Sequence, residues 1–112
     1  MRNSEIKFSI QLDDNNIPEN ILWEASEKRP QIAEPTQAIC ISLWDDSQKN
    51  TLKIDLWTKN MPVDTMKRFY VETLGGLAES LKNATGDETM VNEMNDLCER
   101  LGKYLEASSK KV

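Results

Sequence analysis

The first feature of the chain is an alternation of apolar and polar residues near its start. Residues 6–12 follow this pattern over their whole length, which is typical of a β-strand with one buried face. Its apolar members are Ile6, Phe8, Ile10 and Leu12. The run 13–18 is rich in Asp and Asn and ends in proline, so it predicts a turn. Residues 21–25 then predict a second, shorter strand.

Two further alternating stretches predict a β-hairpin. Residues 38–44 and 51–57 each alternate, and the polar run 45–50 separates them. Two strands joined by a short polar turn are most simply antiparallel neighbours. One face of this hairpin is then aliphatic, carrying Ile39, Ile41, Leu43, Leu52, Ile54 and Leu56. The opposite face carries Cys40, Trp44, Lys53, Asp55 and Trp57.

At Pro62 the apolar spacing changes from two residues to about 3.6, which predicts a helix that runs to about Asn83. Asp64 near its start either caps this end or complements the helix dipole. Gly86 suits a left-handed helix end, and Asp87 suits the N-cap of a second helix. The apolar stripe of that helix consists of Met90, Met94, Leu97, Cys98, Leu101, Tyr104 and Leu105.

Strands followed by helices indicate an α+β fold. We expect an antiparallel sheet of three or four strands, followed by two C-terminal helices packed on one face. The 112 residues fit a single domain, residues 1–112. Within it, residues 26–37 contain two prolines among charged residues and are expected to form a mobile loop. Residues 107–112 are expected to be a frayed tail.

The net charge indicates which class of partner the chain can bind, and its cysteines indicate the cellular compartment. The net charge of −5 and a pI of about 4.8 argue against a nucleic-acid partner, which would require clustered cations. The sequence has neither the apolar segment of a secretory signal nor one long enough for a membrane span, so we expect no membrane insertion. Cys40 and Cys98 lie far apart in the chain and suit free thiols in a reducing compartment. We therefore expect a cytoplasmic protein.

The sequence offers little chemistry for catalysis. It contains no histidine, which removes the usual general base, and it contains no glycine loop for phosphate. The pairs Asp13–Asp14 and Asp45–Asp46 fall in predicted turns, and turn preference explains them better than an acid pair does. Asp55 is explained equally well by a charge pair with a strand neighbour. We expect no enzyme activity, no cofactor and no metal.

The face that carries Trp44 and Trp57 is the better candidate for a site. Together with Lys53, Asp55 and Cys40, the two indoles form a mixed aromatic and polar surface, which resembles the composition of protein–protein interfaces. The alternative is that the loop of residues 26–37 folds over this face. An exposed strand edge also invites pairing with a second copy, so we expect a homo-oligomer.

Three stretches resemble the gliding motility-associated protein GldC of Bacteroidota: SEIKFSIQLDDNNIPENILWEAS, LWDDSQKNTLKIDLWTKNMPVDTMKRFY and TGDETMVNEMNDLCERLGKYLE. The resemblance spans about residues 4–106, and KIDLWTKNMPVD is its most specific part. It implies a small cytoplasmic accessory protein of gliding motility, and through it of the type IX secretion apparatus. No catalytic residues come with the resemblance.

The order of strands and then two helices is also similar to that of the export chaperone SecB, as an analogy of fold only. We therefore expect a non-enzymatic protein that binds a motility or secretion component, or that holds exported chains as a chaperone. The alternative is a small-ligand or lipid-binding domain. Its cavity would lie between sheet and helices around Gly75 and Gly76, although a kink or a close approach explains that glycine pair more simply.

Overall fold

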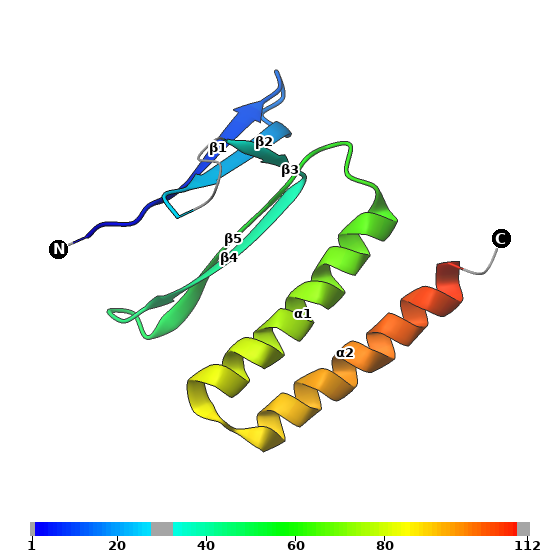
Figure 1. Cartoon of the computed structure of the whole chain (residues 1–112). Helices are drawn as coiled ribbons and strands as arrows, with labels where there is room; N and C mark the ends of the chain where they lie inside the picture. Colours follow the sequence, from blue (N-terminus) through cyan, green and yellow to red (C-terminus); the bar gives the residue numbers. More distant parts are fainter. Residues whose placement is uncertain (1, 28–32, 110–112) are drawn as a thin grey trace. The chain divides into compact units, whose positions relative to one another are not determined.

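The computed structural model describes residues 2–27 and 33–109. The chain divides into two compact units, Met1–Met61 with the strands and Pro62–Val112 with the helices (Figure 1). Antiparallel strands come first and two helices follow, which confirms the α+β class and the element order. The organisation as a single domain stays a prediction.

The first sheet contains three strands in the order β1-β2-β3. These are β1 (Ile6–Leu12), β2 (Pro18–Ala25) and β3 (Glu34–Thr36). β1 and β2 are antiparallel, and Phe8 lies opposite Trp23 while Ile10 lies opposite Ile21. Ile21 of β2 is 1% exposed. The prediction of a buried apolar face on β1 is wrong, because Ile6, Ile10 and Leu12 are exposed and Phe8 is half-buried.

β3 differs from the prediction, because it lies within the expected mobile loop. Pro35 lacks a backbone donor and is tolerated because β3 is the last strand of its sheet. Residues 28–32 of the expected loop lie outside the described residues. The described chain thus has five strands in two sheets, in place of one sheet of three or four.

The second sheet is the hairpin of β4 (Ala38–Asp45) and β5 (Asn50–Trp57), and its antiparallel pairing confirms the prediction. The last residue pair before the turn is Asp45 opposite Asn50. Asp45 Oδ1 accepts hydrogen bonds from the N–H groups of Ser47 (3.0 Å) and Gln48 (3.2 Å). Lys49 adopts a φ of 55° in this turn. The acidic pair of residues 45 and 46 therefore shapes a turn, as turn preference predicts.

The second unit consists of two helices, α1 (Val63–Thr85) and α2 (Glu88–Ser109). Asp64 lies in the first turn of α1 without capping it, so it complements the dipole. Gly86 has a φ of 68° and donates its N–H to Lys82 O at 2.9 Å, which ends α1 in the left-handed conformation. Asp87 Oδ1 accepts the Met90 N–H at 3.1 Å, which confirms the predicted N-cap of α2.

Small side chains bring the two helices together. A Cβ atom on Gly75 would lie 3.4 Å from Cys98 Sγ, while one on Gly76 would meet nothing within 4 Å. The Cys98 thiol donates a hydrogen bond to Val71 O at 3.4 Å. The missing side chain of Gly75 therefore allows α2 to approach α1 closely, and α1 continues as a helix through both glycines. Residues 107–109 of the expected tail are helical, and residues 110–112 lie outside the described residues.

Candidate functional site

The register of the β4–β5 hairpin places all five predicted site residues on one face. Cys40 lies opposite Asp55, Trp44 opposite Thr51, and Trp57 opposite Ala38, while Lys53 lies opposite Ser42. Residues directly opposite each other in an antiparallel pair point to the same side of the sheet. The alternation in the sequence is therefore sufficient to find this face.

The polar members of this face form a contact cluster at its centre. Lys53 Nζ lies 3.6 Å from Cys40 Sγ and 3.5 Å from Asp55 Oδ1. The Asp55 carboxylate accepts a hydrogen bond from the thiol and, with partial burial, raises the pKa of Cys40 above its usual value. The charge of Asp55 likewise raises the pKa of Lys53. The thiol thus stays protonated at neutral pH, which suits a polar contact better than a nucleophile.

The two indoles stand at opposite ends of the same face. Trp57 is paired at the open end of the hairpin and Trp44 near the turn, so about 20 Å of strand separates them. Trp44 is 63% exposed and Trp57 48% exposed. They therefore form two separate aromatic ends with the Cys40–Lys53–Asp55 cluster between them. Sequence reasoning found the face but not this separation.

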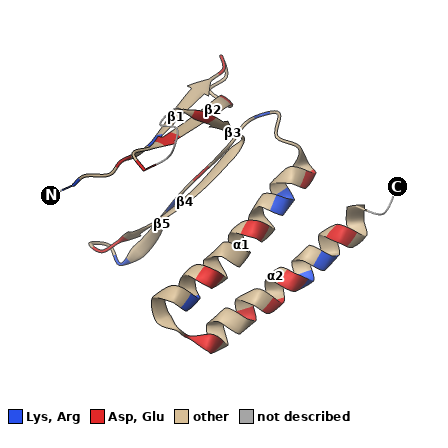
Figure 2. Cartoon of the chain, viewed as in Figure 1, with Lys and Arg blue, Asp and Glu red and all other residues tan. Residues whose placement is uncertain are grey.

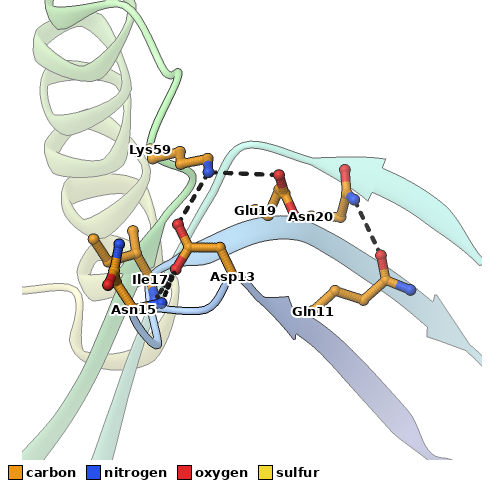
Figure 3. Close-up of polar contacts among 7 residues, drawn as sticks. All are labelled: Gln11, Asp13, Asn15, Ile17, Glu19, Asn20 and Lys59. Atoms are coloured by element: carbon orange, nitrogen blue, oxygen red, sulfur yellow. Dashed lines mark hydrogen bonds and ion pairs between the residues drawn. The ribbon is translucent and has the colours of Figure 1, made fainter.

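A second cluster, drawn in Figure 3, lies at the turn that the sequence predicted around Asp13, but the contact of this turn with Lys59 was not predicted. Asp13 Oδ1 accepts the N–H groups of Asn15 (2.8 Å) and Ile17 (3.0 Å), and its Oδ2 lies 3.0 Å from Lys59 Nζ. Lys59 Nζ also lies 3.5 Å from Glu19 Oε1. The hydrogen bonds from Ile17 and Lys59 lower the pKa of Asp13, and the bond with Asp13 raises the pKa of Lys59. This cluster is a structural junction.

Thr58, next to this junction, is buried at 4% exposure. Its Oγ1 has no hydrogen-bond partner within the described part of the chain. Its N–H donates to Gln37 O at 2.8 Å, which extends the pairing of the hairpin by one step. Thr58 lines an open groove of about 310 Å³ together with Ile21, Pro35 and Thr36.

Another groove, of about 480 Å³, lies between α1 and α2 and is lined by Val71, Gly102 and Leu105 with a charged rim. The glycine pair 75–76 is not among its described lining residues. A small-ligand site around that pair stays a prediction. Among residues 2–27 and 33–109, no group of three or more Cys, Asp or Glu side chains is arranged to hold a metal ion.

The model of the family described as "Gliding motility-associated protein GldC-like" matches residues 18–107, which is most of the chain. No curated protein and no solved structure matches. Within the described residues, neither helix is both long enough and apolar enough to span a membrane.

Proposed function

The chain belongs to the gliding motility-associated GldC-like family, and from this membership we propose that it is a non-enzymatic interaction module. Its ligand is an extended segment of a protein partner, which binds along the Trp-bearing face and one of the two free edges of the β4–β5 hairpin. The partner is a component of the gliding machinery or of the type IX secretion apparatus.

The observation that carries the proposal is the incomplete sheet. Within the described residues, β4 and β5 pair only with each other, so each eight-residue strand keeps one unpaired edge. A two-stranded hairpin is marginally stable by itself, and a third strand supplies further backbone hydrogen bonds. Addition of a strand to a free edge is a common way to bind an extended peptide.

The side chains of the face add specificity to this edge. The exposed indoles of Trp44 and Trp57 supply apolar area at the two ends, and Trp is the residue type most enriched among energetically dominant interface positions. Between them, Lys53 and Asp55 offer one positive and one negative charge. A segment that fits has apolar side chains about six residues apart and polar side chains between them.

A chaperone role is the second candidate, because an unfolded exported chain presents the same extended, apolar chemistry. The free edges of the hairpin and its two indoles favour this candidate as well as a fixed partner. The two differ in selectivity. A fixed partner is one protein with one segment, whereas a chaperone binds many exported proteins before they fold.

The test places a photo-crosslinking amino acid at Thr51, opposite Trp44, in a motile strain. One crosslinked motility or secretion component is expected, and many unfolded exported proteins would indicate the chaperone role. Thr65 on α1 is the matched control position. Crosslinks that are equal at both positions would contradict the proposal.

Purified components then measure the affinity. Replacement of Trp44 or Trp57 by Ala is expected to weaken binding of the identified segment on the order of 10- to 100-fold. Trp23→Phe, in the other sheet, is the control and should bind as the native chain does. Unchanged affinity in the Trp44→Ala, Trp57→Ala double variant would exclude this face as the binding site.

A further inference from the structure

The helical unit carries a second apolar surface, distinct from the hairpin face. On α1 its exposed members are Val63, Tyr70 and Leu77, spaced seven residues apart. On α2 they are Met90, Leu97, Leu101 and Tyr104, spaced by seven, four and three residues. Spacings of seven, or of three and four in turn, form the seam of helices that pack against other helices. We call these seven side chains the helical stripe.

Both halves of the helical stripe lie on the same side of the unit. On α1, Leu77 directly precedes the buried Ala78, and on α2, Met90 directly precedes the buried Val91. One residue turns a helix by about 100°. On both helices, the stripe residue thus comes one position before a buried residue. Because the two helices are antiparallel neighbours joined by two residues (Figure 1), this shared offset places both halves of the helical stripe on one side of the unit.

The opposite side of the unit is charged. Arg68 Nε lies 3.2 Å from Glu72 Oε1, and Lys103 Nζ lies 3.2 Å from Glu99 Oε1. Figure 2 shows charged residues along both helices. The helical hairpin is therefore amphipathic as a pair, with one solvated side and one apolar side.

The size of the helical stripe fits a specific interface. Tyr104 is 62% exposed and Val63 65% exposed, and the seven side chains together present on the order of 700 Å² of surface. A specific interface buries about 800 Å² on each partner, whereas the largest apolar patch of a typical monomer is about 300–600 Å². The helical stripe thus matches one half of a dimer interface.

We propose that the helical stripe binds the same stripe of a second copy, giving a symmetric four-helix contact between two chains. A two-fold interface joins one patch to itself, so the seven-residue spacing on both helices supplies matching knobs and holes in each copy. Four-helix bundles pack in this way. The dimer leaves the ion pairs of the charged side in solvent.

The test is sedimentation velocity of the full chain over a range of concentrations. The double variant Leu77→Glu, Leu101→Glu places charge in the helical stripe and is expected to be monomeric. The control Asn83→Glu, Asn95→Glu adds the same charge at exposed positions outside it and is expected to dimerise as the native chain does. Circular dichroism should show equal helix content in all three proteins.

Two results would overturn the proposal: a native chain that stays monomeric at every concentration, or a dimer that persists in the double variant. If the double variant fails to fold, Tyr104→Ser replaces it, because it changes only a largely exposed ring and should weaken dimerisation at least tenfold. The Trp44→Ala, Trp57→Ala variant should dimerise normally. Loss of self-association and loss of partner binding are thus measured separately.

Discussion

Lys59 Nζ lies 3.0 Å from Asp13 Oδ2, although 46 residues separate the two in the chain. Lys59 follows Thr58, the first residue after β5, and Asp13 lies in the turn after β1. The contact therefore joins the end of the hairpin to that turn. The backbone reinforces it, because the Lys59 N–H donates to Pro18 O at 3.0 Å at the start of β2. The three-stranded sheet and the hairpin of the first unit are therefore connected at this point by a side-chain pair and a backbone hydrogen bond.

This junction predicts acid sensitivity. The pKa of Asp13 is lowered in the folded chain, so its contribution to the free energy of unfolding is present above the usual value of 3.8. It is lost as the pH falls through the lower, folded pKa. Asp13→Asn should lower the melting temperature at neutral pH, and the difference from the native chain should shrink below pH 3.8.

Asp14→Asn is the matched control for this prediction, since the neighbouring Asp14 is an exposed residue of the same turn. It should leave the melting temperature nearly unchanged across the same pH range. Equal melting temperatures of the Asp13 variant and the native chain at neutral pH would show that the junction contributes nothing to stability.

The Cys40–Lys53–Asp55 cluster predicts that the thiol of Cys40 reacts slowly with alkylating reagents. Because Asp55 raises the pKa of Cys40, little thiolate exists at neutral pH and alkylation by iodoacetamide should be slow. Asp55→Asn removes the negative charge and should accelerate alkylation of Cys40, with the pH midpoint of the rate shifted downward. Peptide mass spectrometry separates Cys40 from Cys98.

Lys53→Gln is the opposing variant in that experiment. Lys53 Nζ contacts the Cys40 sulfur at 3.6 Å and lowers the pKa of the thiol, in opposition to Asp55. Its loss should slow alkylation further. A faster reaction in Lys53→Gln than in the native chain would contradict the assigned order of these two effects.

Two glycines of the helical unit should respond in opposite directions to alanine. Gly76 is helical and a Cβ there meets no atom within 4 Å, so Gly76→Ala should stabilise the chain by about 0.5–1 kcal/mol. Gly86 has a φ of 68°, so Gly86→Ala should destabilise it by about 1–2 kcal/mol. Urea unfolding measures both. Shifts of the same sign would contradict the assigned backbone roles.

What the sequence predicted correctly follows from local physics. The period of two in residues 6–12 and the change of period at Pro62 each depend on neighbouring residues alone, and both define elements in the structure. Gly86 and Asp87 marked the junction of the helices for the same reason, because left-handed backbone and N-capping are single-residue preferences.

What the sequence did not predict depends on distant residues. β3 has three residues and a proline, so it carries no alternation to detect and forms only because β2 offers an edge. The partner of Asp13 is 46 residues away, and no local pattern marks Lys59. Likewise, alternation placed Trp44 and Trp57 on one face, while the register of the hairpin decided that they stand at opposite ends.

The buried hydroxyl of Thr58 gives the last prediction. Its Oγ1 has no partner among the described residues, and an unpaired buried polar group costs about 1–3 kcal/mol. Valine has the same branched shape and keeps the backbone N–H that bonds to Gln37 O. Thr58→Val should therefore raise the free energy of unfolding by about 1 kcal/mol, measured by urea titration.

Thr58→Ser separates the hydroxyl of this residue from its methyl group. Serine keeps the unpaired oxygen and removes a buried methyl, so it should destabilise the chain by about 1 kcal/mol. Native threonine should then lie between the two variants in stability. A less stable Thr58→Val would mean that the hydroxyl is bonded in solution, because only the loss of a hydrogen bond outweighs the gain from removing an unpaired oxygen.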